Sequence, residues 1–286
     1  MKTLARALIY VLASILVSGP AFAADPSSFP SNSLDAQSLG RGGTVIALGP
    51  GIWSTFGNPA TLTPEGFSTL GVDYLDHKDA PDTSWGLSVL DTSSSIRGSL
   101  SYYKDPEFGP EFSDFRNQMW GVSFCQTLLP SLYLGESFHL GEYEPDSSPG
   151  SVKRLTTVDA GLLFKLGSNV SLGYVAHNLF PDDRDLLQQF NGFGIGLQLP
   201  LTIFFAADYE EDPDLDGEVN LRTGVEFNPF KKLIGRLGYQ DLANGDTFMT
   251  MGISYSEVTG TLDAAIRYND QTEKTDRLAF GISIRM

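Results

Sequence analysis

From residue 67 to the end, the chain consists of short segments in which apolar residues alternate with small or polar ones. The last segment is the clearest, because Leu278, Phe280 and Ile282 share one face of an extended strand while Ala279 and Gly281 share the other. A period of two is typical of strands, whereas the apolar residues of an amphipathic helix recur every three or four positions. The chain is therefore predicted to fold almost entirely into β-structure.

Gly, Pro, Asn, Asp and Ser separate these segments, as expected of turns between antiparallel strands. The predicted strands cover 67–76, 84–91, 95–103, 117–128, 132–143, 155–166, 169–178, 190–199, 201–209, 219–227, 232–240, 247–256, 260–268 and 276–286. This pattern continues without a break in composition, so we expect residues 67–286 to form one domain, a single antiparallel barrel of about 14 strands.

The second face of the strands bears on whether such a sheet lies in water or in lipid. A soluble sandwich packs its apolar face inward, whereas a transmembrane barrel turns it toward lipid and keeps polar residues in its lumen. The second face carries charges of both signs among many glycines, which suits a lumen and also suits a solvated sheet surface. The predicted lumen charges are Arg97, Asp159, Arg222, Glu226, Arg236, Asp263 and Arg267.

Loop lengths and aromatic residues favour the transmembrane barrel. Short connections such as 130–131 and 167–168 alternate with long ones such as 104–116 and 179–189. Outer-membrane barrels have short periplasmic turns, longer outer loops and aromatic girdles at both lipid–water boundaries. Aromatic residues accordingly gather near the predicted strand ends, at Tyr74, Tyr102, Trp120, Tyr143, Tyr209, Phe227, Tyr239 and Tyr268.

One predicted strand, 132–143, conflicts with this scheme. Its apolar face includes Leu134 and Phe138, and strict alternation places Glu136 between them, facing lipid. A charge in mid-membrane costs up to a few kcal/mol. Three explanations stay open: a bulge at Gly135 resets the register, the glutamate faces a partner, or the strand boundary is wrong.

The first residues predict export. Lys2 and Arg6 precede an apolar run that ends in Ala21-Phe22-Ala23, which is typical of a secretory signal peptide covering residues 1–23. The apolar run is shorter than the about 20 residues that a membrane-spanning helix needs. The single cysteine, Cys125, lies far downstream, so neither a lipid anchor after the cleavage site nor a disulfide framework is expected.

The net charge limits the partners. The formal charge is −16, and loss of the signal peptide makes the mature chain more negative. Phosphate recognition requires clustered Lys and Arg, so nucleic acid is not an expected partner. The outward apolar faces of such strands make outer-membrane lipid an expected partner.

Residues 24–66 form a separate segment without sustained alternation. It contains the glycine cluster Gly40-Arg41-Gly42-Gly43, a small apolar run and then Asn58-Pro59-Ala60. The glycine cluster lacks the Gly-Lys-Ser/Thr ending of a phosphate-binding loop. By itself it marks backbone that turns tightly or packs closely.

This segment resembles the N-terminus of the FadL-like family of fatty-acid and hydrocarbon uptake barrels and of the related PorV/PorQ-type proteins. The matching positions are Gly40, Gly42, Gly43, Ala47, Asn58, Pro59, Ala60 and Leu62. The stretches 171–179 and 262–265 are similar to recurring pieces of the PorV-like branch. The resemblance implies a fourteen-strand barrel located in the outer membrane, with residues 24–66 folded into it as a hatch.

Two features depart from that family. The chain is shorter than fatty-acid transporters usually are, and its outer loops look too small for an extended extracellular groove. Its final residue is Met286, where barrel-assembly signals usually have Phe. The first departure weakens the expectation of substrate uptake, and the second leaves the assembly signal less typical.

Catalytic and metal sites are poorly supported. His77, His139 and His177 lie on different predicted strands, so they could bind a metal only if folding brings them together. No Gly-x-Ser-x-Gly motif is present, and neither enzyme activity nor a cofactor is expected. Asp212, Asp214 and Asp216 resemble the front of a calcium loop, but position twelve is Thr223 and the flanks are strands, so simple solvation is favoured.

The lumen charges and the hatch each have two interpretations. The charges could line a passage, although pairing across a narrow barrel is favoured. Asn58 to Ala60 either gates a channel or caps the barrel floor.

Three functions follow from these alternatives. The first is transport of hydrophobic small molecules of fatty-acid or hydrocarbon type, and the second is a PorV-like accessory barrel for protein secretion or envelope assembly. A passive diffusion pore is the third, and the mixed lumen charges and the short chain make it the least favoured.

Overall fold

The computed structural model describes residues 35–48, 51, 53–78, 83–104, 118–143, 151–182, 187–211 and 218–286. The predicted signal peptide and the candidate calcium loop lie outside these ranges. Among the described residues, no helix is both long enough and apolar enough to cross a membrane.

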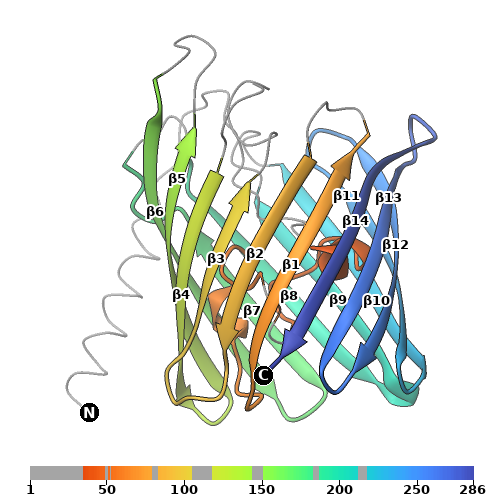
Figure 1. Cartoon of the computed structure of the whole chain (residues 1–286), viewed down its shortest axis with the longest axis horizontal. Helices are drawn as coiled ribbons and strands as arrows, with labels where there is room; N and C mark the ends of the chain where they lie inside the picture. Colours follow the sequence, from red (N-terminus) through yellow and green to blue (C-terminus); the bar gives the residue numbers. More distant parts are fainter. Residues whose placement is uncertain are drawn as a thin grey trace.

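Fourteen antiparallel strands form one closed barrel (Figure 1). They are β1 Ser68–His77, β2 Thr83–Asp91, β3 Arg97–Lys104, β4 Gln118–Leu129, β5 Leu132–Tyr143, β6 Lys153–Leu166, β7 Val170–His177, β8 Phe190–Leu199, β9 Ile203–Glu211, β10 Val219–Phe230, β11 Leu233–Asp241, β12 Thr247–Glu257, β13 Gly260–Asn269 and β14 Lys274–Arg285. Each strand pairs with its sequence neighbours, and β1 pairs with β14 to close the sheet. The predicted all-β barrel and its strand number are confirmed, with strand ends within three residues of those expected.

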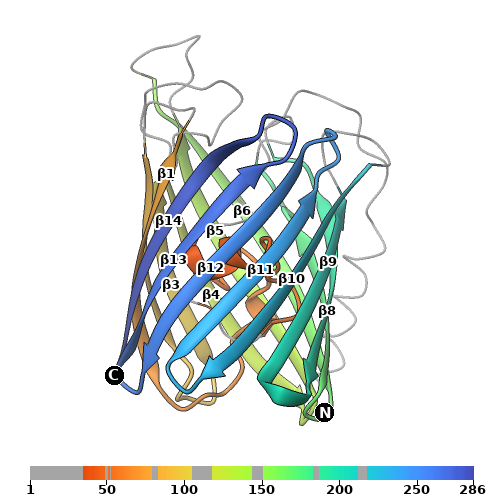
Figure 2. The same ribbon diagram turned by 90° about the vertical axis from the view of Figure 1, so that its right-hand side faces the viewer.

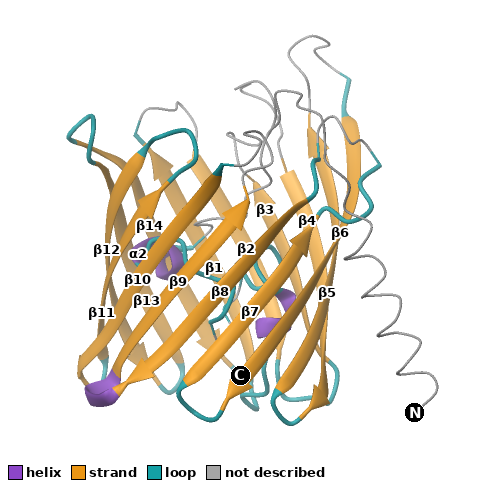
Figure 3. Ribbon diagram, turned by 180° about the vertical axis from the view of Figure 1, so that it is seen from behind, coloured by secondary structure: helices purple, strands orange, loops and turns teal. Residues whose placement is uncertain are grey.

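The two ends of the barrel differ in their connections. Tight connections such as 130–131 between β4 and β5 lie at the end that also holds the C-terminus, and the strand ends that the longer connections join lie at the opposite end (Figure 1). The 3-10 helix η2, Pro200–Thr202, forms one of the tight connections and is visible at that edge in Figure 3. We call these the short-turn end and the long-loop end.

Apolar side chains cover the outside of the barrel. On β14, Phe280, Ile282 and Ile284 are about half exposed, whereas Ala279 on the opposite face is fully buried. The same alternation is found on β12, where Met249, Met251, Ile253 and Tyr255 point outward. Soluble monomers rarely expose apolar patches larger than a few hundred Å². A continuous outward belt of this kind is suited to lipid.

Aromatic rings mark the long-loop end of this belt. Tyr102 on β3 lies between Trp85 on β2 and Trp120 on β4, with ring centroids 5.0 Å and 4.7 Å apart. Amphipathic rings favour the boundary between lipid and water, because one part of the ring system is apolar and another is polar. This row therefore corresponds to one of the girdles predicted from the sequence.

The register overturns one explanation for Glu136. Pairing between β4 and β5 is unbroken from Gln118 opposite Glu142 to Thr127 opposite Tyr133, and β5 pairs with β6 over its whole length. A bulge at Gly135 is therefore wrong, since a bulge would interrupt one of these ladders. The strand boundaries at 132 and 143 are confirmed. Glu136 consequently lies on the outward face.

The described part of the N-terminal segment lies inside the barrel (Figures 1 and 2). It contains the short helix α2, Ala36–Gly40, and the 3-10 helix η1, Pro59–Thr61. We call residues 35–48, 51 and 53–66 the inner segment. Asp35 caps α2, with Oδ1 accepting a hydrogen bond from the backbone N–H of Ser38 at 2.6 Å. Burial raises the pKa of the Asp35 carboxyl, although the bond from Ser38 opposes this shift.

Candidate functional site

The inner segment packs directly against inward-facing glycines of the barrel wall. A Cβ atom added to Gly161 on β6 would lie 1.9 Å from Oδ1 of Asn58. A Cβ added to Gly135 on β5 would lie 2.2 Å from the backbone of Pro59 and Ala60. Real Cβ atoms do not approach other atoms so closely, so the wall admits the segment at these points because it has no side chains there.

Asn58 joins two parts of the inner segment to the wall. Its side-chain amide donates to the carbonyl of Ile46 at 2.7 Å and to that of Leu162 on β6 at 3.2 Å. Its Oδ1 accepts from the backbone N–H of Ala60 at 3.0 Å, which caps η1. Asn58 is fully buried. The Asn-Pro-Ala motif is thus a turn whose capping residue also contacts the barrel.

The glycine cluster forms the turn after α2. Gly42 and Gly43 have φ angles of 70° and 77°, the left-handed region in which side chains are strained. The Gly42 N–H donates to Oγ1 of Thr250 on β12 at 2.9 Å, and this hydroxyl donates to the carbonyl of Gly40 at 3.2 Å. Gly40 also lies against Gly252, so the turn is seated closely on β12.

Two carboxylates of the wall hold the inner segment at further points. Oδ2 of Asp208 on β9 accepts from the backbone N–H groups of Val45 and Ile46 at 2.6 and 2.9 Å. Asp73 on β1 accepts from the Ala36 N–H at 3.2 Å and from Nε1 of Trp53 at 2.8 Å. Sequence reasoning did not select Asp73 as a site residue. The available signal was its place on the inward face of a predicted strand.

The predicted lumen charges all lie on inward faces and are all partnered. Arg236 bonds Glu226 at 2.8 Å and lies 3.6 Å from Asp263, and Glu226 also bonds Arg41 of the inner segment at 3.3 Å. The other pairs are Arg222 with Glu210, Arg267 with Asp276, and Arg97 with the carbonyl of Leu62. The charges are thus partnered, but the pairs join strands that are adjacent or one strand apart, or join the wall to the inner segment, and not facing walls of the lumen.

Folding brings two of the three histidines together. Oδ2 of Asp159 lies 3.0 Å from Nε2 of His139 and 2.9 Å from Nδ1 of His177, and all three residues are buried. Oδ1 of Asp159 also accepts from the Asn178 N–H at 2.9 Å. His77 is elsewhere, with Nε2 2.6 Å from the Ser84 hydroxyl. Within the described ranges, no cluster of His, Cys, Asp or Glu has the arrangement of a metal site.

An apolar cluster lies in the half of the lumen nearer the long loops. Trp53 and Phe56 of the inner segment stack with centroids 6.0 Å apart, and Tyr103 of β3 meets Trp53 edge-on at 5.9 Å. Phe56 also stacks on His139 at 5.4 Å. We call this group the outer cluster, consisting of Trp53, Phe56, Tyr103, Met119, Leu155 and Leu187.

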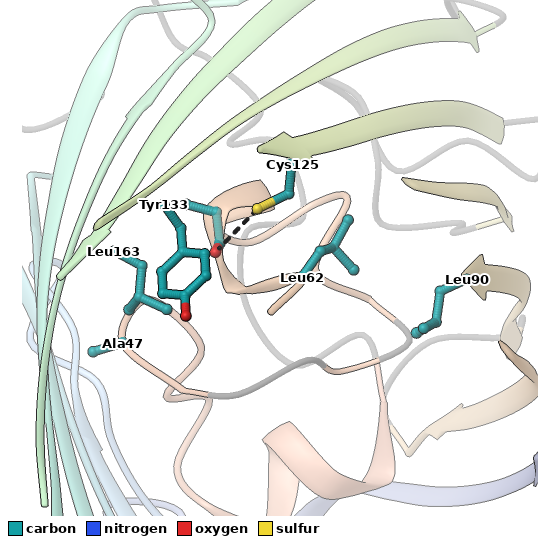
Figure 4. Packing of buried hydrophobic residues seen from close by; sticks show 7 residues of the cluster. Ala47, Leu62, Leu90, Cys125, Tyr133 and Leu163 are labelled. Carbon is teal, nitrogen blue, oxygen red and sulfur yellow. Dashed lines mark hydrogen bonds between the residues drawn. The ribbon is translucent and has the colours of Figure 1, made fainter. Parts of the chain in front are cut away.

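A second apolar cluster comes from strand positions nearer the short turns. Figure 4 shows its packing. Cys125 of β4 points at the inner segment, with its Sγ 3.6 Å from the carbonyl of Ala60. A buried thiol of this kind is not made reactive by its surroundings and packs as a small apolar group. We call this group the inner cluster, consisting of Ala47, Ala60, Leu62, Leu90, Cys125, Tyr133 and Leu163.

Solved structures resemble the barrel over most of the chain. The CymD monoaromatic hydrocarbon channel matches with a TM-score of 0.63 at 16% identity, over 90% of this chain and 98% of that chain. The toluene transporter TbuX of Ralstonia pickettii matches with a TM-score of 0.61 at 15% identity, over 90% and 99%. The toluene transporter TodX of Pseudomonas putida gives 0.61 at 15%, over 91% and 98%.

The barrel has the FadL-like fold. The predicted resemblance is therefore confirmed at the level of fold. These structures are described as channels and transporters. No family model matches the sequence, and the search of curated proteins found no match.

Proposed function

We propose that this chain is an outer-membrane channel for hydrophobic small molecules, exported with the help of a cleaved signal peptide at residues 1–23. The closed barrel, its outward apolar belt and the FadL-like fold support this location. Single-ring hydrocarbons are the proposed substrates, since the similar channels named above are described as handling toluene or monoaromatic hydrocarbons. Long-chain fatty acids are the competing class.

The observation that carries the proposal is the outer cluster. It places Trp53 and Phe56 of the inner segment against Tyr103 of the wall, all less than 5% exposed. An apolar solute that replaces Phe56 would gain stacking and burial without leaving a polar group unpaired. Displacing Trp53 in addition breaks the hydrogen bond from its Nε1 to Asp73. The cluster lies in the half of the lumen nearer the long loops, so a solute entering from that end can reach it before the inner cluster.

In the proposed mechanism the inner segment acts as a hatch. A solute that reaches the outer cluster displaces Phe56 and Trp53, and the segment carrying Gly40, Gly42, Gly43 and Asn58 to Ala60 shifts away from the wall. The inner cluster then provides the next apolar surface on the way to the short-turn end. The charge pairs within the wall, such as Arg222 with Glu210, stay in place while the segment moves. The bonds of Glu226 to Arg41 and of Arg97 to the Leu62 carbonyl break, because Arg41 and Leu62 belong to the segment.

A fluorescence titration tests the binding step, because the chain has only three tryptophans. Trp85→Phe with Trp120→Phe leaves Trp53 as the single emitter inside the lumen. Toluene is expected to change Trp53 emission to saturation, and oleate only at higher concentration. The matched control, Trp53→Phe with Trp85→Phe, keeps the outward Trp120 and is expected to show no saturable change. Failure of Trp53 to respond to either compound, together with unchanged hydrocarbon uptake in cells lacking the protein, would remove the proposal.

The second candidate is a PorV-like accessory barrel. The extensive bonding of the inner segment to the wall favours it, since a filled lumen requires no solute passage. This function predicts a stable complex with a secreted or envelope protein. It also predicts that hydrocarbons do not change the fluorescence emission of Trp53. Crosslinking in intact cells separates the two, because a solute channel needs no such complex.

A further inference from the structure

Glu136 faces outward from the middle of the apolar belt. Along β5 its face also carries Leu132 and the buried Leu134 toward the short turn, and the exposed Phe138 and Leu140 toward the long loops. Across the sheet it lies opposite Phe124 of β4 and Ala160 of β6, within two unbroken ladders.

This position is unusual for an acidic residue in this barrel. The other carboxylates on outward positions of the described strands lie at or next to strand ends, where headgroups and water can solvate them. They are Asp76, Asp91, Glu142, Glu211, Asp241 and Glu257. Glu136 is four residues from the nearer end of β5, with apolar side chains on both sides.

Glu136 also differs from the charges of the lumen. Each predicted lumen charge has an ion-pair or hydrogen-bond partner, whereas Glu136 forms neither with any residue that the structure describes. A carboxylate in contact with hydrocarbon is costly, because neither water nor a counter-charge stabilises it. The register has excluded a bulge, and no described residue pairs with this carboxylate, so its partner has to come from outside the described part of the chain.

The described strands of a second copy do not supply that group. In the described strands, outward Lys104 and Arg154 lie at the ends of β3 and β6, and the middle of the belt offers no cation. Two copies related by a twofold axis through this face would bring two Glu136 carboxylates together, and like charges repel. Lipid headgroups stay at the boundary and do not reach the centre of the belt.

We propose that Glu136, Phe124 and Phe138 form a docking surface for a different membrane-embedded protein, which presents a lysine or arginine to the Glu136 carboxylate. The two phenylalanines are 45% and 49% exposed and provide apolar contact on either side of the charge. Ala160 leaves space beside the carboxylate for a long basic side chain. The cation and the carboxylate neutralise each other in a medium where each alone is costly.

A reconstituted assay tests the charge chemistry. The full-length protein in liposomes is mixed with a synthetic membrane-spanning helix bearing one central lysine, and association is followed by energy transfer between dyes. The lysine helix is expected to associate several-fold more tightly with the unchanged protein than with Glu136→Gln. The same helix with leucine in place of lysine is expected to associate equally with both proteins. Equal association of the lysine helix with both proteins overturns the proposal. Glu136→Leu serves as a second variant. A leucine at this position suits lipid, so this substitution favours folding of the barrel.

A cellular experiment tests for the partner itself. A photocrosslinking amino acid replaces Phe138, which keeps Glu136 intact, and the control replaces the outward Met251 on β12. The expected product is a protein adduct at position 138 that is absent at 251 and lost with Glu136→Lys. Its crosslinked peptide carries a lysine or arginine, and changing that residue to glutamate restores the adduct with Glu136→Lys. Adducts only to lipid, or an adduct indifferent to Glu136→Lys, contradict the proposal.

Discussion

Asn58 links the inner segment to the barrel wall through a single amide group. Its Nδ2 bonds one carbonyl in the segment and one in β6, and its Oδ1 caps η1. A buried carbonyl that loses its hydrogen-bond donor cannot bond water instead, so its desolvation is left without compensation. Asn58 therefore stabilises the packing of the inner segment against the barrel wall.

Replacing Asn58 with alanine is expected to loosen the inner segment without unfolding the barrel. The unpaired buried groups should cost about 1–3 kcal/mol of local stability. Hydrogen exchange of amides between residues 44 and 62 should accelerate, while exchange in β12 and β13 stays unchanged. Asn244→Ala is the matched control, because Asn244 lies in an exposed turn and bonds only Asp246 within it. Equal exchange in the two variants would contradict this account of Asn58.

The sequence predicted the identity of these residues better than their contacts. Motif alone points to Asn58 to Ala60 and to the glycine cluster, and Asn58, Pro59, Ala60, Gly40, Gly42 and Gly43 are buried. Asp73 and Asp208 were not selected as sites, because the atoms that they bind belong to residues 36, 45, 46 and 53. Alternation reveals which face a side chain occupies, but not which distant loop lies beneath it.

At the scale of the element, the strands followed from local physical rules. Period two, turn residues and loop lengths were sufficient to place β8 at 190–199 and β5 at 132–143, which are the observed limits. The meeting of His139 and His177 on Asp159 was beyond those rules, since it depends on how β5, β6 and β7 are aligned. The same alignment was needed to choose among the explanations for Glu136.

Glycines on the inward faces of the strands leave room for the inner segment. Gly161 provides the sharpest test of this packing. A side chain there would collide with the Asn58 amide, while the strand itself accepts alanine readily. Gly161→Ala is expected to unseat η1 and to increase protease cleavage within residues 53–62 in the folded barrel. Ala264→Val adds bulk on the outward face of β13 and should leave cleavage unchanged. Cleavage that is unaltered by Gly161→Ala would indicate that the segment is not seated there.

At the scale of the whole molecule, the outward belt determines the environment in which the barrel is stable. Met251 lies at the middle of β12 and Tyr255 nearer its short-turn end, and both are about half exposed. In lipid, a charge costs more at the centre than at the boundary, whereas in water both positions would tolerate one.

Arginine substitutions on β12 measure this depth dependence. Met251→Arg is expected to destabilise the barrel in bilayers, lowering its free energy of unfolding by about 2–4 kcal/mol. Tyr255→Arg is expected to lower the same free energy by about 0–1 kcal/mol. Urea titration of the refolded protein in lipid vesicles gives both values. Similar small effects at both positions would show that these side chains do not face hydrocarbon.

The central claim is that the inner segment must move for a hydrocarbon to pass, and a reversible crosslink tests it most directly. The Thr55 hydroxyl bonds the Ser99 hydroxyl of β3, so Thr55→Cys with Ser99→Cys, in a Cys125→Ser background, can tie the segment to the wall. The control ties two wall strands instead, through Ser88→Cys and Ser101→Cys, whose native hydroxyls are 2.7 Å apart. Uptake of labelled toluene is expected to stop in the oxidised Thr55–Ser99 variant, to return after reduction, and to persist in the control in both states. Undiminished uptake through the oxidised, fully crosslinked Thr55–Ser99 variant would contradict the account.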